Sequence, residues 1–251
     1  QPVGKDLSEY KSECHHGTAY TKMIADYSDI HSEVRYYVPL NKTYEVWNLI
    51  LTNNSKQARS LNVTGYAEFT NNSNYEQDQV NLQYSQYITQ TVFVENRVRQ
   101  MIHANLDQIE DGKEVDNKDV VNRFIGLAGS KVSSWCGDRE EFLGRYHGYG
   151  NPTGVETGEL NNHGNYNENG CGAITTTIEL APGESRTIAF IVGMIDNKEA
   201  GEIVNLYADT KAVCDRELEE LITYWHGQLS HFQIKTPSDE FNTMINTWNA
   251  Y

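Results

Sequence analysis

The segment LNVTGYAEF, residues 61–69, alternates apolar and polar residues one by one. Successive side chains of an extended strand point to opposite faces, so Leu61 and Val63 share one face while Asn62 and Thr64 share the other. This alternation predicts a β-strand that is buried on one face only. Because most of the first two-thirds of the chain shows the same period, it constrains the fold to a mainly β class.

Similar segments occur in pairs joined by polar turns. YEVWNLILT at 44–52 precedes the strand at 61–69, and NNSKQAR between them predicts a hairpin turn. AITTTIEL at 173–180 and RTIAFIVGM at 186–194 predict a second hairpin. Its turn, Ala181–Glu184, places Pro where φ is fixed and Gly where φ is positive. Short strands with polar returns and no intervening helices predict a two-sheet antiparallel β-sandwich.

The hydrophobic period changes near Asp209. Apolar residues then recur at intervals of three and four, which predicts an amphipathic helix; they are Val213, Leu218, Leu221, Ile222, Trp225, Leu229 and Phe232. A second helix is expected from TPSDEFNTMINTWNAY, with Thr236 or Ser238 as its N-cap. We therefore expect a β-sandwich domain at 1–200 and a helical linker at 201–251, together forming a fragment of a longer protein.

The net charge of −15 excludes several partners. Nucleic acids and anionic membranes attract clustered Lys and Arg, so neither is expected to bind. No apolar run approaches the roughly 18 residues of a membrane-spanning helix. Sixteen Tyr and four Trp suit either sugar faces or β-sheets, and the pattern leaves both explanations open.

The cysteines indicate a reducing compartment. Cys14, Cys136, Cys171 and Cys214 lie far apart and form no CxxC pair, which predicts free thiols in a cytoplasmic protein. Acceptor patterns for N-glycosylation, among them those that begin at Asn41, Asn53 and Asn62, argue the other way, but such triplets arise easily in a chain rich in Asn.

Residues 151–174 hold five Gly and six Asn, which predicts an irregular backbone with positive φ angles. Long irregular segments usually have a function. Gly148, Gly150 and Gly154 are spaced GxGxxxG rather than GxGxxG, and no strand–turn–helix pattern surrounds them, which argues against a dinucleotide site. The chain has no GKS or GKT, which excludes a Walker loop.

Single Cys and His residues raise the question of a metal site. Cys14 and His16 fall on one face of a strand and could chelate a metal with His147, His163 or Cys171, but without a second paired set we expect no metal site.

Paired carboxylates are what glycoside chemistry needs, and Asp138, Glu140 and Glu141 form an acidic cluster. With 35 acidic residues in the chain such clusters are inevitable, so we assign no catalytic role to these three.

Seven short motifs follow one another along the chain. They are ECHHGTAYTKM, VRYYVPLNKTYEVWNLILTNNS, GYAEF, DREEFLGRY, NPTGVETGELNN, LAPGESRTIAFIVG and TPSDEFNTMINTWNAY. In this order they resemble the N-terminal region of glycoside hydrolase family 94, formerly glycosyltransferase family 36. The family contains cellobiose, laminaribiose, cellodextrin, chitobiose and cellobionic acid phosphorylases.

The resemblance implies a fold and a reaction. Family members have an N-terminal β-sandwich (a supersandwich), a linker of two helices, a large (α/α)₆ catalytic barrel and a small C-terminal sheet. They cleave a β-linked disaccharide with inorganic phosphate and inversion, and they release an α-sugar 1-phosphate. An Asp of the barrel is the general acid, while phosphate itself attacks the anomeric carbon.

For this chain the resemblance implies several properties. Phosphate is a co-substrate, no cofactor is needed, and the sandwich, lacking its first strands, packs against its own barrel in a homodimer. The segment alone is inactive and holds no catalytic residue. The stretch at 151–174 is implied to pack near the linker and barrel, a structural role that we favour over direct sugar binding.

One segment carries function by resemblance. Relatives of the cellobiose type have an Asp-Gln-x-Asn-x-Gln run followed by Arg, which reaches the acceptor sugar of the neighbouring subunit. DQVNLQYS gives Asp78, Gln79, Asn81 and Gln83, with Tyr84 in place of the Arg, which puts glucose as acceptor in doubt. We expect Asn81, Gln83 and Tyr84 to bind the acceptor from a strand; a polar strand edge is the other explanation. A non-catalytic carbohydrate-binding sandwich remains the alternative function.

Overall fold

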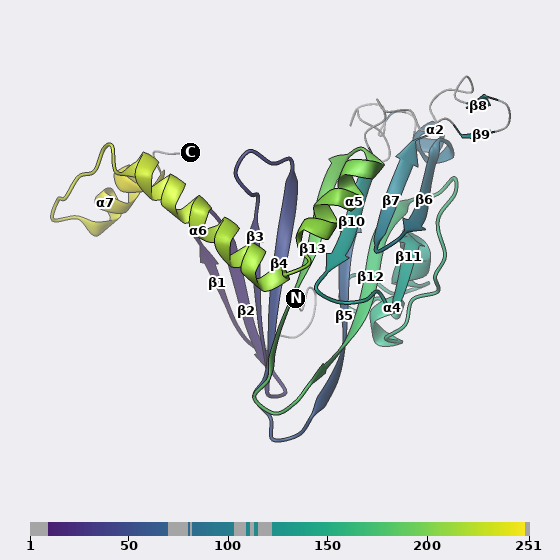
Figure 1. The fold of residues 1–251 in the computed structure, drawn as a ribbon, viewed down its shortest axis with the longest axis horizontal. Helices are drawn as coiled ribbons and strands as arrows, with labels where there is room; N and C mark the ends of the chain where they lie inside the picture. The colour runs from purple at the N-terminus through teal and green to yellow at the C-terminus, as the bar shows by residue number, and fades with distance from the viewer. Residues whose placement is uncertain are drawn as a thin grey trace.

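The computed structural model describes residues 10–69, 80, 82–102, 109–110, 113–114 and 122–248. Two antiparallel sheets pack face to face, and helices lie outside both of them (Figure 1). The predicted antiparallel β-sandwich followed by helices is confirmed.

The larger sheet has eight strands in the order β1-β2-β3-β4-β13-β10-β7-β6. Their bounds are β1 Lys11–His16, β2 Thr21–Tyr27, β3 Ile30–Tyr37, β4 Tyr44–Asn53, β6 Thr89–Val94, β7 Arg97–Ile102, β10 Asn122–Ala128 and β13 Ser185–Ile195. The smaller sheet has the order β11-β12-β5, with β11 at Ser134–Asp138, β12 at Gly170–Leu180 and β5 at Arg59–Glu68. Strands β8 (Ile109–Glu110) and β9 (Lys113–Glu114) form a separate ladder.

Both predicted hairpins are wrong in their pairing. Strand β4 pairs with β13, where Thr52 lies opposite Ser185, and β5 pairs with β12, where Leu61 lies opposite Ile178. Each polar turn therefore leads from one sheet to the other, and the two turns lie together at one end of the sandwich (Figure 1). The two strands of each pair face the same core from opposite sides, so burial separates them into different sheets instead of pairing them.

The turn chemistry itself is confirmed. Glu184 N donates to Ala181 O at 3.0 Å, and Gly183 has a φ of 76°. At this angle a residue with a Cβ would be strained, which explains the glycine.

Asn53 joins the two turns. Its side chain is fully buried, and Nδ2 donates to Gln57 O at 2.7 Å and to Leu180 O at 3.0 Å. Its Oδ1 accepts from Ser55 N at 3.0 Å, and its main-chain oxygen accepts from Gly183 N at 2.8 Å. The carboxamide thus satisfies buried main-chain groups of both turns, and it is not accessible as a glycosylation acceptor.

Two hydrophobic cores lie on the two faces of the larger sheet. The inner core fills the space between the sheets and includes Val98, Ile125, Leu127, Ile174, Leu180 and Phe190. The outer core lies beneath helices α5 (Asn197–Leu206) and α6 (Thr210–Leu229) and includes Val46, Phe124, Ile191, Val204, Tyr207 and Cys214. Strands β4, β10 and β13 are consequently buried on both faces.

The helices largely follow the predicted pattern. Helix α6 agrees with the predicted amphipathic helix, and α7 (Asp239–Asn246) begins after Ser238, whose Oγ accepts from Phe241 N at 3.2 Å. Helix α5 lies where the sandwich was expected to end: Asp196 caps it by accepting from Glu199 N at 3.0 Å. Among the described helices none is long and apolar enough to cross a membrane.

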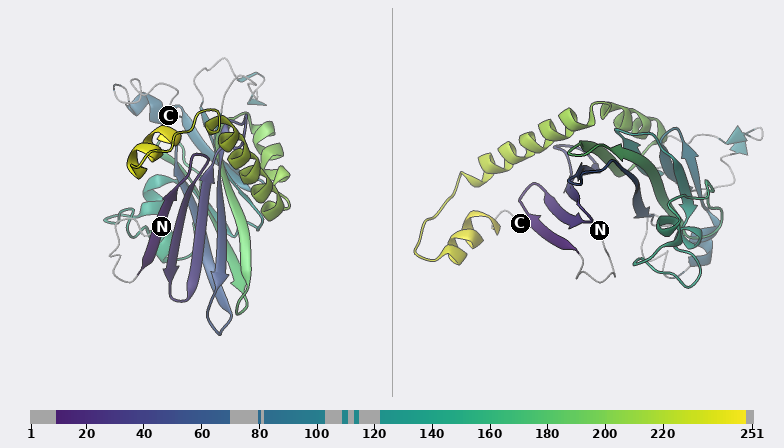
Figure 2. Two further views of the ribbon diagram at one scale, coloured as in Figure 1. Left: turned by 90° about the vertical axis from the view of Figure 1, so that its left-hand side faces the viewer. Right: turned by 90° about the horizontal axis from the view of Figure 1, so that it is seen from below.

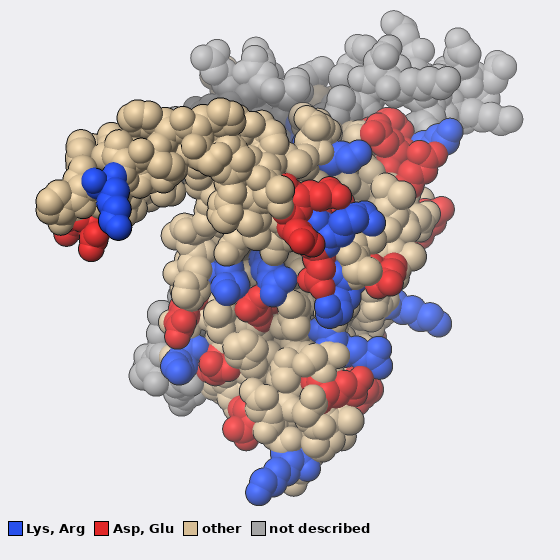
Figure 3. All heavy atoms as spheres, turned by 60° about the vertical axis from the view of Figure 1, so that its left-hand side comes forward, with Lys and Arg blue, Asp and Glu red and all other residues tan. Residues whose placement is uncertain are grey.

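Charges of both signs are interspersed over the face drawn in Figure 3. Ion pairs also lie along β2, β3 and α6: Lys22 to Glu33 at 3.9 Å, Arg35 to Glu33 at 2.5 Å and Arg35 to Asp215 at 3.6 Å. This face therefore offers no continuous basic patch to a polyanion.

A partly buried carboxyl group attaches α6 to the sheet. Glu217 Oε2 accepts from the Tyr37 hydroxyl of β3 at 3.1 Å and from the Tyr207 hydroxyl at 2.7 Å. Burial raises the pKa of Glu217, and the hydrogen bonds from Tyr207 and Tyr37 only partly offset this effect. A raised folded-state pKa means that stability is fully present below the unfolded pKa of this carboxyl and is lost as pH rises through its folded pKa.

We expect Glu217→Gln to remove this pH dependence while it keeps an oxygen acceptor for both tyrosines. The unfolding free energy of the variant minus that of the wild type should increase as the pH rises from about 4, near the usual pKa of a glutamate, through the raised folded-state pKa of Glu217. Urea unfolding at a series of pH values measures this difference. A difference that does not change with pH would contradict the role assigned to Glu217.

Candidate functional site

The predicted acceptor segment is helical instead of extended. Gln83 lies exposed in α2 (Leu82–Tyr87), Asn81 lies outside the described residues, and Tyr84 belongs to α2 without a described side chain. The strand assignment is therefore wrong. Leu and Gln are good helix formers, and a run this short does not let alternation distinguish a strand from a helix.

Helix α2 is attached to the segment at 151–174. Gln86 Nε2 donates to Asn169 Oδ1 at 2.9 Å, and Thr89 Oγ1 donates to Gln86 O at 3.1 Å. These bonds fix the end of the helix beside the start of edge strand β6, so the exposed Gln83 lies near one end of that strand.

The Gly- and Asn-rich segment closes the open side of the sandwich. After α4 (Thr153–Glu156) it runs between β11 and β6: Gly137 N donates to His163 O at 2.8 Å, and Thr91 N donates to Asn165 O at 2.9 Å. It thereby covers the outer edge of β6, an edge that would otherwise expose unpaired main-chain groups.

The segment at 151–174 was expected to pack near the helical linker, and this expectation is wrong. Helices α3 (Arg139–Leu143) and α4 lie beside the smaller sheet, whereas α5 and α6 lie on the far side of the larger sheet (Figures 1 and 2). In the described structure the segment therefore packs against the sandwich alone, and contact with a barrel stays a prediction.

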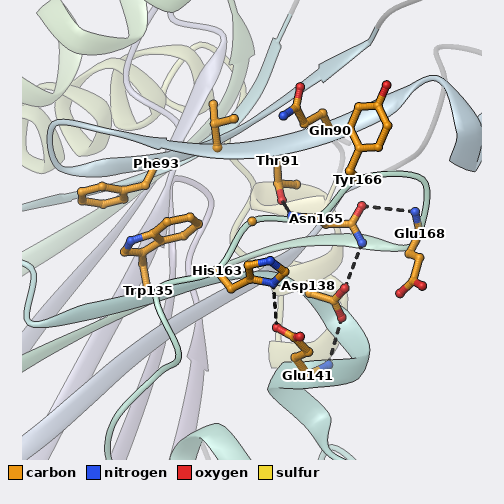
Figure 4. Close-up of a pocket in the computed structure, with 12 residues that line it drawn as sticks. Gln90, Thr91, Phe93, Trp135, Asp138, Glu141, His163, Asn165, Tyr166 and Glu168 are labelled. Carbon is orange, nitrogen blue, oxygen red and sulfur yellow. Dashed lines mark hydrogen bonds and ion pairs between the residues drawn. The ribbon is translucent and has the colours of Figure 1, made fainter.

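A groove of about 510 Å³ lies where this segment meets β6 and β11 (Figure 4). Its side chains come from three parts of the chain, namely Gln90, Thr91 and Phe93 of β6, Trp135, Asp138 and Glu141 around β11 and α3, and His163, Asn165, Tyr166 and Glu168 of the irregular segment. The volume is within the range of roughly 300–1,000 Å³ that small-molecule sites occupy.

Two aromatic rings form one end of the groove. Phe93 and Trp135 are stacked, with ring centroids 5.3 Å apart and planes inclined by 15°. Trp135 is also fixed through its main chain, because Asn162 N donates to Trp135 O at 2.9 Å and Trp135 N donates to Asn162 Oδ1 at 3.0 Å. The indole is therefore held in one orientation.

Asp138 has a structural role in the wall of the groove. Its Oδ1 caps α3 by accepting from Glu141 N at 2.9 Å, and its Oδ2 accepts from the buried Asn165 Nδ2 at 3.1 Å. Glu140 points elsewhere and accepts from Arg139 Nη1 at 2.6 Å. The structure thus separates the acidic cluster of the sequence into a cap, a surface ion pair and Glu141.

Glu141 faces His163 across the groove. Its Oε2 lies 3.1 Å from His163 Nδ1 and also accepts from Asn161 Nδ2. Within the described residues, Oε1 of Glu141 and Nε2 of His163 have no protein partner. Tyr166 is 62% exposed at the other end, beside Gln90, with which it forms a β-bridge. The groove therefore combines fixed aromatic rings with unused hydrogen-bonding groups.

A second polar cluster fixes α3 against β5. Glu68 Oε1 accepts from Arg139 Nε at 2.9 Å, from the Tyr66 hydroxyl at 2.8 Å and from the Tyr149 hydroxyl. Burial raises the pKa of Glu68, but the hydrogen bonds from Tyr149, Tyr66 and Arg139 outweigh it and hold this pKa below its usual value. Arg139 is consequently engaged with carboxylates.

The candidate metal ligands are not brought together. Cys14 Sγ and His16 Nε2 lie 3.4 Å apart on exposed strand β1, while Cys171 is buried in β12 and His147 binds Asn151 O at 2.8 Å. In the ranges that the structure describes, no three His, Cys, Asp or Glu residues are grouped to hold a metal ion.

Known proteins resemble this chain over its whole length. The family model "Glycosyl hydrolase 94, supersandwich domain" matches residues 1–210. N,N'-diacetylchitobiose phosphorylases of Vibrio proteolyticus and Vibrio furnissii are 30% and 29% identical to it, over 100% of this chain and 30% of each relative. A cyclic beta-(1,2)-glucan synthase of Rhizobium meliloti is 26% identical over 98% of this chain and 8% of the synthase.

The chain thus spans about 30% of the length of the two phosphorylases. The family match covers both sheets of the sandwich and α5. The resemblance seen in the seven sequence motifs is confirmed. The chain belongs to glycoside hydrolase family 94, and its two sheets form the supersandwich domain of that family.

Proposed function

We propose that this chain is the supersandwich part of an inverting phosphorylase. The complete enzyme would cleave a β-linked disaccharide with inorganic phosphate to give an α-sugar 1-phosphate, with phosphate as co-substrate and no cofactor. The observation that carries this proposal is the alignment of two phosphorylases with the chain from end to end. The glucan synthase has lower identity, and the match covers only 8% of its length. It therefore gives weaker support for a glucan synthase activity of the complete protein than the phosphorylases give for phosphorolysis.

The domain would serve the reaction without a catalytic residue. Its roles in the proposal are dimerisation, packing against a catalytic barrel and completion of the acceptor site by Gln83, Tyr84 and Asn81. Exposure of Gln83 on α2 supports the last role, because an exposed amide can donate to and accept from sugar hydroxyls of a neighbouring subunit. The four cysteines are free thiols, which supports the proposed cytoplasmic location.

We expect Gln83→Ala in the complete enzyme to raise the KM for the acceptor about three- to tenfold, because one hydrogen bond to an uncharged group is lost. The KM for the sugar 1-phosphate should change little. Phosphate release from α-glucose 1-phosphate or α-N-acetylglucosamine 1-phosphate, with glucose or N-acetylglucosamine as acceptor, measures both constants.

The matched control is Gln57→Ala, which truncates an exposed Gln in the turn between β4 and β5. Its acceptor kinetics should equal those of the wild type. Unaltered kinetics of Gln83→Ala, or full activity of a monomer, would contradict the acceptor contact. Absence of phosphate release with every donor and acceptor pair would contradict the phosphorylase itself.

A further inference from the structure

We propose that the groove along edge strand β6 binds a neutral β-linked oligosaccharide through Trp135, Tyr166, Glu141 and Glu168. The groove is distinct from the acceptor contact at Gln83, and the proposal does not depend on phosphorylase activity. It would give the sandwich a carbohydrate-binding role of its own.

The first argument is the placement of the aromatic rings (Figure 4). Trp135 is held by its stack on Phe93, and Tyr166 stands beside Gln90 at the other end. Gln90 and Phe93 are three residues apart in β6, which separates the two ends by about 10 Å along the strand at 3.3 Å per residue, and alternation places these two side chains on opposite faces of the strand. This separation fits a ligand longer than one pyranose ring, with apolar ring faces on the aromatic side chains.

The second argument is the set of unused polar groups in the lining of the groove. Glu141 is oriented by His163 and Asn161, which bind Oε2 and leave Oε1 without a protein partner in the described chain. The carboxylate of the exposed Glu168 likewise has none there, while its main-chain N binds Asn165 Oδ1 at 3.3 Å. Sugar hydroxyls donate to carboxylates in charge-assisted bonds, which are the stronger kind.

The third argument is the sign of the charge. The groove is lined by the carboxylates of Asp138, Glu141 and Glu168, and among the residues that the structure describes its lining includes no Lys or Arg. A phosphate or uronate would be repelled, since the described lining residues offer no Lys or Arg to compensate its charge. The groove therefore selects neutral sugars and does not serve as the phosphate site.

The test titrates the 251-residue chain with cellobiose, N,N'-diacetylchitobiose and cellotetraose, followed by calorimetry and by two-dimensional NMR. We expect saturable binding of at least one of them and none of α-glucose 1-phosphate at the same concentrations. Tyr166→Ala and Glu168→Gln should each weaken binding by about fivefold or more, the effect of one lost contact. Trp135→Ala should abolish binding, provided that its thermal unfolding shows a folded chain.

The matched control is Tyr146→Ala, because Tyr146 is fully exposed and does not line the groove. It should bind like the wild type. Failure of all three neutral sugars to bind, equal binding of α-glucose 1-phosphate, or unchanged affinity in both Tyr166→Ala and Glu168→Gln would overturn the proposal. Since no catalytic domain takes part, such a failure would leave the proposed phosphorylase function intact.

Discussion

Asn53→Ala is expected to lower the unfolding free energy of the sandwich by about 2–4 kcal/mol. The wild-type Nδ2 serves the main-chain oxygens of Gln57 and Leu180, and the bond to Leu180 is buried. Without the amide the buried oxygen of Leu180 loses this donor, whereas the Gln57 oxygen keeps the bond from the Ser55 hydroxyl, and no solvent reaches the position because Asn53 is fully buried. An unsatisfied buried acceptor costs about 1–3 kcal/mol, and the alanine also leaves a small cavity.

The matched control for this change is Asn54→Ala, because Asn54 is the next residue and its side chain is exposed. Its stability should stay within about 0.5 kcal/mol of the wild type. Urea unfolding followed by fluorescence and by circular dichroism compares the three proteins. Equal stability of Asn53→Ala and Asn54→Ala would show that the buried carboxamide does not hold the two turns together.

The second large effect is expected for Gly164→Ala, which should destabilise the chain by about 2–3 kcal/mol. A Cβ at this position would lie 2.3 Å from Thr91 O, and this oxygen belongs to the main chain of β6. The contact must be relieved by moving the segment outward. That movement would strain the bond from Thr91 N to Asn165 O, which is 2.9 Å long.

Gly148→Ala provides the control, because a Cβ on Gly148 would meet no atom within 4 Å. It should unfold at the wild-type urea concentration, whereas Gly164→Ala should unfold at a lower one and bind oligosaccharide more weakly. If the two alanine variants were equally stable, the close approach of the segment to β6 would not be required for the fold.

Alternation predicted which faces of the strands are buried, but it could not predict their partners. Leu61 and Val63 do pack against the inner core, as their pattern indicates. Strand β4 carries an equally apolar pattern and faces the same core from the other sheet. One hydrophobic face is compatible with either sheet, so the sequence pattern alone allowed a hairpin that the sandwich does not contain.

The sequence contains a signal for helix α5, but the β-sandwich was expected to extend to residue 200, so no helix was predicted there. Ala200, Ile203, Val204 and Tyr207 are spaced as one face of a helix, and all four are buried against the sheet. Asp196 precedes them as an N-cap. The spacing of apolar residues and the N-cap are therefore sufficient to predict this helix.

The groove could be predicted only in part. Asp138, Glu141 and His163 stand out in the sequence as single residues, Trp135 and Tyr166 belong to the general abundance of Trp and Tyr, and Phe93 has no signal of its own. Their meeting depends on the segment that crosses from β11 to β6, and no local spacing encodes that crossing. The Gly and Asn content predicted the irregular backbone but not its destination.

The crossing of both turns between the sheets also determines when the domain can fold. Ser185 Oγ and Thr52 Oγ1 are 2.7 Å apart although 133 positions separate the residues, and Ser60 and Glu179 bond across 119 positions. Closing such loops is entropically costly, and chains dominated by distant contacts fold slowly. On the ribosome, β1 to β4 can form a local meander early, but the smaller sheet is incomplete until β12 has emerged at residue 180 and the larger sheet until β13 has emerged at residue 195. During that interval the apolar face of β4 stays exposed, and the nascent chain is most prone to aggregate there.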